Sequence, residues 1–215
     1  MRLNRLHIAI LVPLLAASLW AQPSQIPAIT SHVTALSNGI EITRGELHEQ
    51  ILALRDDVLR IRAWRDDKAP EDASWAVLDS ARHASVPITP ANSVDHAGFA
   101  TANLAVDVNE QTLEITLRDR AGNILQQDAR PIAFEGDAFR IRKTMPLDEH
   151  YFGLGDKTGP LDRRNEAFTL WNTDAYRYQE STDPLYKSIP YFMAFRAGHA
   201  LGVLLDNTWR GSFAS

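Results

Sequence analysis

The sequence predicts an all-β protein, an antiparallel β-sandwich with few short helices. Apolar residues alternate with polar ones in several short segments, and turn-forming residues separate these segments. No sustained 3.6-residue periodicity occurs beyond the apolar segment at the N-terminus. Short strands separated by turns at such intervals are typical of a sandwich.

The clearest predicted strand lies in residues 111–118, where Leu113, Ile115 and Leu117 alternate with polar residues. This alternation places one face of the strand on a core and the other in water. Weaker alternation predicts further strands within residues 39–43, 58–64, 104–108, 139–141 and 191–205. Gly-containing turns are indicated at residues 37–39, 120–123 and 135–137.

Residues 46–62 are ambiguous, because Leu47, Ile51, Leu54 and Leu59 recur at nearly helical spacing. One interpretation is a helix, since Leu, Glu and Arg are good helix formers. We favour the other, two strands joined by a turn at residues 55–57. Residues 66–92 are rich in Pro, Ala, Ser and Asp and predict an irregular surface excursion with one short strand.

The N-terminus has the pattern of an export signal. Arg2 and Arg5 precede an apolar stretch at residues 6–19, and Ala21 offers a cleavage site. The stretch is shorter than the roughly 20 residues that span a bilayer, so we favour cleavage over retention as an anchor. We expect residues 1–21 to be removed, residues 22–30 to form a flexible lead, and the protein to be exported to the periplasm or the extracellular space, with no membrane partner afterwards.

Charge and length narrow the function classes. The net charge of −5 becomes −7 when Arg2 and Arg5 are removed, which argues against nucleic acid as a partner. The chain has no cysteine, so it can form no disulfide and carry no lipid anchor on a cysteine. Its stability therefore depends on buried apolar surface. Residues 31–215 suffice for one sandwich domain but not for an additional (β/α)8 barrel, which needs about 250 residues.

Several kinds of site are not indicated. The seven histidines are scattered, and His48-Glu49 lacks the second histidine of a zinc helix, so we expect neither a metal site nor a cofactor. Gly153, Gly155 and Gly159 lack the spacing of a phosphate loop and are expected to permit tight turns. No spacing forces a catalytic pair among the carboxylates of Asp156, Asp162, Asp174, Glu180, Asp183 and Asp206.

Asp174 lies in a segment with the composition of a sugar site. Asn172 precedes it, and Trp171, Tyr176 and Tyr178 surround it. Carboxylate and amide oxygens accept hydrogen bonds from sugar hydroxyls, while aromatic rings cover apolar C–H faces. The structural alternative is that Asp174 caps a turn through its own backbone and Trp171 lies in the core.

Four stretches of this chain carry a family resemblance: HYFGLGDKTGPL at residues 150–161, LWNTDAY at 170–176, TDPLYKSIPYF at 182–192 and DNTWR at 206–210. They resemble the N-terminal, galactose-mutarotase-like β-sandwich of glycoside hydrolase family 31, which contains α-glucosidases and α-xylosidases. The resemblance is strong over residues 151–210 and fainter over residues 33–139. It implies a domain that ends before the catalytic barrel of an exported retaining α-glycosidase.

The resemblance also implies roles for residues. Asp174 would contact the sugar on the leaving-group side of the scissile bond of an α-linked oligosaccharide or glycoside, and Asn172 and Tyr176 would shape the same loop. Both catalytic carboxylates would belong to the barrel, so this chain has no catalytic residue and is expected to be inactive alone. The chain departs from the family wording at Asn165 and Arg177, where glycine is common, and at Ala167, where a basic residue is common.

Two other functions remain open at this point. One is a free-standing glycan-binding sandwich, which needs an exposed aromatic platform. The other is an aldose mutarotase, which needs a general acid and base, with His150 as the candidate. A lone histidine in such a segment is more often satisfied in a core. We also expect Trp209 and Arg210 to pack against a following domain.

Overall fold

A computed structural model describes residues 29–215 and confirms the all-β prediction. The predicted export signal and residues 22–28 of the predicted lead lie outside the described residues. No helix within residues 29–215 is long and apolar enough to span a membrane. The elements are β1 (Ser31–Leu36), β2 (Gly39–Arg44), β3 (Leu47–Arg55), β4 (Val58–Arg65), α1 (Asp79–Arg82), β5 (Thr89–Pro90), β6 (His96–Ala100), β7 (Leu104–Asn109), β8 (Ile115–Asp119), β9 (Ile124–Glu135), β10 (Ala138–Lys143), β11 (His150–Gly155), β12 (Ala167–Leu170), β13 (Ser188–Arg196), β14 (His199–Leu204) and β15 (Gly211–Ala214).

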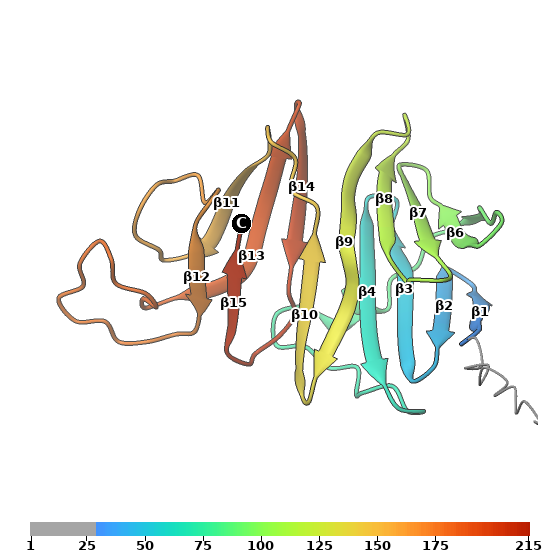
Figure 1. The fold of residues 1–215 in the computed structure, drawn as a ribbon, viewed down its shortest axis with the longest axis horizontal. Coiled ribbons are helices and arrows are strands. Elements are labelled where there is room, and N and C mark those ends of the chain that lie inside the picture. The colour runs from blue at the N-terminus through green and yellow to red at the C-terminus, as the bar shows by residue number, and fades with distance from the viewer. Residues whose placement is uncertain (1–28) are drawn as a thin grey trace, which may run out of the picture.

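Residues 31–143 form a two-layer sandwich (Figure 1). A four-stranded sheet, in the order β1-β2-β3-β4, packs on a six-stranded sheet, in the order β10-β9-β8-β7-β6-β5, and all paired strands are antiparallel. The core between the sheets consists of Ile40, Ile42, Ile51, Ala53, Ala97, Phe99, Val106, Val108, Leu113, Ile115 and Leu117. Alternate residues of β2, β3, β6, β7 and β8 supply most of this core, as the period of two requires.

The ambiguous segment at residues 46–62 is confirmed as strands. β3 and β4 pair through a turn at Asp56 and Asp57, and alternate residues of β3 face the core. The excursion at residues 66–92 is also confirmed, because it contains only the four-residue α1 and the two-residue β5.

Two boundaries differ from the sequence expectation. The strand predicted at residues 111–118 begins only at Ile115, because Leu113 has a left-handed backbone (φ 63°) and enters the core from a turn. The side chain of Asn109 builds that turn by accepting hydrogen bonds from the N–H groups of Gln111 and Thr112. Residues 191–205 are a hairpin, in which Ala197 and Gly198 form the left-handed turn between β13 and β14.

Residues 150–215 form a second, smaller packing unit, on the left of Figure 1. A three-stranded sheet, in the order β11-β13-β14, packs on the two-stranded sheet of β12 and β15. Its core is small and comprises Leu154, Phe168 and Leu170, with Phe192 and Phe213 partly buried around them. The aromatic rings of Phe192 and Phe213 are 5.0 Å apart, so this core is built largely from ring contacts.

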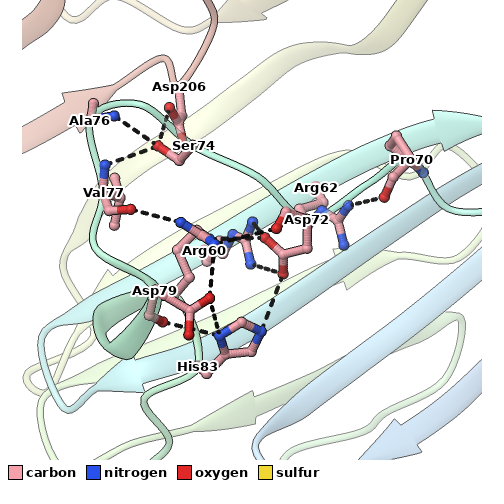
Figure 2. A network of polar contacts seen from close by, with 11 residues as sticks. Arg60, Arg62, Pro70, Asp72, Ser74, Ala76, Val77, Asp79, His83 and Asp206 are labelled. Carbon is pink, nitrogen blue, oxygen red and sulfur yellow. Dashed lines mark hydrogen bonds and ion pairs between the residues drawn. The ribbon is translucent and has the colours of Figure 1, made fainter.

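The excursion at residues 66–92 is held on β4 by the carboxylate of Asp72 (Figure 2). The guanidinium of Arg60 binds both oxygens of Asp72, at 2.8 and 2.6 Å, and that of Arg82 approaches within 3.1 Å. The hydrogen bond from Arg60 keeps the pKa of Asp72 well below its ordinary value. The hydroxyl of Ser74 then donates to the carboxylate of Asp206 at 2.8 Å, which joins the excursion to the loop after β14.

Candidate functional site

The candidate site is the loop of residues 171–187 between β12 and β13, which projects at the left of Figure 1. Gly155 at the end of β11 allows the returning end of this loop to approach closely. A Cβ atom on Gly155 would lie 2.3 Å from the carbonyl oxygen of Lys187. Gly153, Gly155 and Gly159 all have positive φ values, which confirms the prediction that they permit conformations other residues disfavour.

Lys157 ties the neck of the loop together. Its side chain is only 1% exposed, and its ammonium donates to the carbonyl of Thr169 at 2.6 Å, to Asp183 at 3.1 Å and to the hydroxyl of Ser188 at 3.2 Å. Asp183 also accepts a hydrogen bond from the N–H of Thr169. Burial by itself would raise the pKa of Asp183, but this N–H and the Lys157 ammonium hold it below its ordinary value.

Asn172 closes the same neck. Its side-chain oxygen accepts a hydrogen bond from the N–H of Ser188 at 2.7 Å, and the N–H of Trp171 donates to the Ser188 hydroxyl at 3.0 Å. Asn172 therefore holds the two ends of the loop together. The sequence did not single out Lys157, Asp183 and Ser188 for this role. The signal that could have suggested it was a lysine within a glycine-rich stretch.

Asp174 lies beyond this neck with its carboxylate exposed. Within residues 29–215, no hydrogen bond or ion pair of the Asp174 side chain is formed. Trp171 is 46% exposed. The alternative in which Asp174 caps its own turn and Trp171 lies in the core is therefore wrong, and the carboxylate is free to accept hydrogen bonds from an outside donor.

Aromatic side chains surround Asp174 on the loop. Tyr176 is 78% exposed, with the guanidinium of Arg177 5.2 Å from its ring centroid. Tyr178 and Tyr186 make an edge-to-face contact at 6.2 Å, and the Tyr186 hydroxyl donates to the carbonyl of Ala175 at 3.1 Å. The outer part of the loop thus presents two unpaired carboxylates, those of Asp174 and Glu180, together with phenol rings, a combination suited to a neutral polyhydroxylated ligand.

Both family glycines that this chain replaces fall at left-handed positions. Asn165 has a φ of 62° and Arg177 a φ of 58°. The backbone shape that glycine adopts without strain is therefore retained at these two positions, although arginine adopts it only at some cost.

Most of the other loop carboxylates have partners in the structure. The carboxylate of Asp162 lies 2.6 Å from Nδ1 of His150, and mainly this hydrogen bond lowers the pKa of Asp162. Asp206 is bound by Ser74.

His150 is half exposed rather than buried, so the expectation of a core histidine is wrong. No group of three or more potential metal ligands occurs in the part of the chain that the structure describes.

The structure defines a class of protein, an antiparallel β-sandwich that carries an exposed loop of carboxylate and aromatic residues. Comparison with known proteins identifies the family. Residues 49–213 match the glycosyl hydrolase 31 N-terminal galactose mutarotase-like domain. The chain therefore belongs to this family.

Two curated relatives are α-glucosidases. Alpha-glucosidase 2 of Bacillus thermoamyloliquefaciens is 30% identical over 163 residues, which are 74% of this chain and 20% of the relative. The α-glucosidase of Saccharolobus solfataricus is 37% identical over 76 residues, which are 35% of this chain and 11% of the relative. The chain thus spans a fifth or less of the length of these relatives.

A solved structure agrees with this assignment. A family 31 dextranase of Flavobacterium johnsoniae, determined with isomaltotriose and with glucose, superposes with a TM-score of 0.78 at 26% identity. The match covers 87% of this chain and 23% of the dextranase. The galactose-mutarotase-like fold that the resemblance implied is thereby confirmed.

Proposed function

We propose that the chain is the N-terminal accessory domain of an exported retaining α-glycosidase of the α-glucosidase or α-xylosidase class. In that enzyme it contributes the loop of residues 171–187 to the leaving-group sugar subsite and packs on a catalytic barrel. The observation that carries the proposal is the free, exposed carboxylate of Asp174 on a loop whose neck is tightly bound. The names of the relatives and the sugars bound to the dextranase support an α-linked oligosaccharide as the ligand.

In this proposal, different residues of the loop bind the sugar and hold the loop in place. The carboxylate of Asp174 accepts hydrogen bonds from sugar hydroxyls, and the ring of Tyr176 covers a C–H face of the sugar. Lys157 and Asn172 hold the neck of the loop in place. Sugar binding therefore has to order few backbone torsions of the loop, which lowers its entropic cost. Cleavage itself needs two carboxyl groups about 5 Å apart, which in this proposal belong to the barrel.

Native protein recovered with an antibody to residues 29–215 tests the proposal. An intact mass several times the 24.0 kDa of this chain is expected, together with hydrolysis of isomaltotriose. In that enzyme, Asp174→Ala should raise KM for isomaltotriose by about tenfold to a hundredfold, because a hydrogen bond to a charged group contributes about 1.5–3 kcal/mol.

An aryl α-glucoside is the matched control substrate, because its leaving group carries no sugar hydroxyl. Its hydrolysis should be nearly unchanged in Asp174→Ala. Glu180→Ala is the matched control variant, since Glu180 is another exposed carboxylate on the same loop. Equal losses on both substrates, or an equal loss in Glu180→Ala, would contradict the assigned role of Asp174.

The chain by itself should have no α-glucosidase or α-xylosidase activity. Turnover of an α-glycoside by the chain alone that disappears in Asp174→Ala would overturn the accessory-domain proposal.

A free-standing glycan-binding module is the second candidate, because the structure exposes two indole rings near the Ser74–Asp206 hydrogen bond. Trp75 is 94% exposed and Trp209 is 81% exposed. Titration of the chain alone with isomaltotriose distinguishes the two. Binding that Trp75→Ala and Trp209→Ala abolish, with a native mass near that of this chain, would favour the binding module.

A further inference from the structure

One face of the β11-β13-β14 sheet is apolar and uncovered. Alternate residues of β13 point to this face, and the pairing register adds Leu204 of β14, opposite Tyr191, and Phe152 of β11, opposite Met193. Its large side chains are 37–51% exposed and belong to Ile189, Tyr191, Met193, Phe195 and Leu204. We call these five residues and Phe152 the β13 face.

The opposite face of the same sheet is already used. Phe192 packs against the small core with β12 and β15, and Ala194 is buried. An antiparallel sheet with one face on a core normally presents polar side chains on the other. The β13 face instead presents a contiguous apolar surface, which marks an interaction site in a soluble protein.

The chemistry of the β13 face fits polypeptide better than sugar. None of its six side chains is charged, and its one polar group is the hydroxyl of Tyr191. At one edge of this face the pairing register places His150, which binds Asp162, opposite Phe195. The ring of Tyr191 lies against Gly202 of β14, where a Cβ atom would be 2.6 Å from the hydroxyl oxygen, so the surface there is flat. Aromatic residues and methionine without charged residues are typical of the buried centre of a protein interface. A sugar needs the carboxylate and amide groups that the loop of Asp174 supplies and that these six side chains lack.

We infer that polypeptide beyond residue 215 of the full-length enzyme covers the β13 face. This inference rests on the proposed function, in which the chain is one domain of a longer enzyme. The lengths of the relatives support this occupant over a second copy, because the chain covers only 20% of the Bacillus α-glucosidase and 23% of the dextranase. An intramolecular partner also covers the face at any protein concentration.

Methionine oxidation tests the inference, because the chain contains a matched pair. Met193 on the β13 face is 37% exposed, and Met145, which precedes β11, is 38% exposed. Dilute hydrogen peroxide should oxidise both at similar rates in the 215-residue chain expressed alone, since susceptibility follows exposure. In native protein recovered with the antibody, Met193 should be oxidised about tenfold more slowly than in the chain alone. Peptide mass spectrometry reads both residues in one sample.

The outcomes separate this inference from the proposed function. A large native mass with Met193 as reactive as in the chain alone overturns the inference and leaves the proposed function standing. A native mass near that of this chain overturns both. Native protein with the mass of two such chains, in which dilution restores the reactivity of Met193, would assign the face to a second copy and also overturn the inference. A large native mass with Met193 protected supports it.

Discussion

The two packing units of this molecule differ in how far they bury their own apolar surface. Residues 31–143 enclose Phe99, Ile42 and Ile51 completely between two sheets. Residues 150–215 enclose a few side chains, leave the β13 face open and extend the loop that carries Asp174. A closed sandwich supplies stability, whereas the unit with less internal packing carries the loop and the open face to which we assign binding. The predictions below test this contrast.

The largest expected effect is the loss of a core ring from the first unit. Phe99→Ala should lower the free energy of unfolding by about 3–5 kcal/mol, because it leaves a cavity between the two sheets. Phe213→Ala in the second unit should cost about 1–2 kcal/mol, because Phe213 is only partly buried. Urea unfolding of both variants provides the measurement. Equal losses of unfolding free energy in the two variants would contradict the proposed difference in packing between the two units.

The first unit also contains a buried acid whose effect depends on pH. Glu49 on β3 is 2% exposed, and burial followed by repulsion from Asp128 raises its pKa from 4.5 to about 8. The ammonium of Lys143 opposes this shift but already pairs with Asp128 at 2.5 Å. Between pH 4.5 and 8 the folded state holds a proton that the unfolded state has lost. Stability therefore falls as pH rises through this window and levels off above it.

Glu49→Gln should remove this pH-dependent penalty. The variant should match the parent near pH 4 and exceed its unfolding free energy by up to about 5 kcal/mol at pH 9. Urea unfolding at several pH values measures the difference, and Glu46→Gln, at an exposed position, is the control. A difference between Glu49→Gln and the parent that did not change with pH would show that Glu49 is not protonated in the folded protein.

The second unit depends on one buried cation at the neck of its loop. Lys157→Ala should cost about 2–3 kcal/mol, because it removes the buried ammonium that binds both Asp183 and the carbonyl of Thr169. Hydrogen exchange should accelerate in residues 169–188 and remain unchanged in β2 and β3. Lys187→Ala is the matched control, since its side chain is 73% exposed and lies 3.9 Å from Asp156. Its expected effect is below about 0.5 kcal/mol.

The smallest expected effect concerns backbone strain beside Asp174. Arg177→Gly should stabilise the chain by up to about 1 kcal/mol, because glycine adopts the observed φ of 58° without steric cost. Thermal unfolding measures the change. Arg164→Gly offers a contrast. This substitution should destabilise the chain, because Arg164 donates hydrogen bonds to the carbonyls of Pro146 and Glu149. A destabilising Arg177→Gly would mean that the contact of Arg177 with Tyr176 outweighs the strain.

Local patterns predicted most strands, and their failures have specific causes. The period of two located β2 and β7 because alternate residues of each strand face a core. It also located β4, although Trp64 is the one buried residue of that strand. It misplaced the start of β8, because a turn built by the side chain of Asn109 delivers Leu113 to the core with a left-handed backbone. The position of Asp174 at an exposed site was implied by the resemblance. Lys157, Asp183 and Ser188 were not anticipated, because their contacts join residues that are distant in the sequence.

The sequence by itself determined the fold class, the turns and the family, because alternation, glycine placement and motif wording are local properties. Only the tertiary structure decided which side chains are free and which are occupied. It showed that Asn172 is bound at the neck of the loop while Asp174 is not, and that one face of β13 lies on a core while the other is open. The reason is physical: burial and hydrogen bonding depend on which strands come together, and strand pairing is set by contacts across the whole chain.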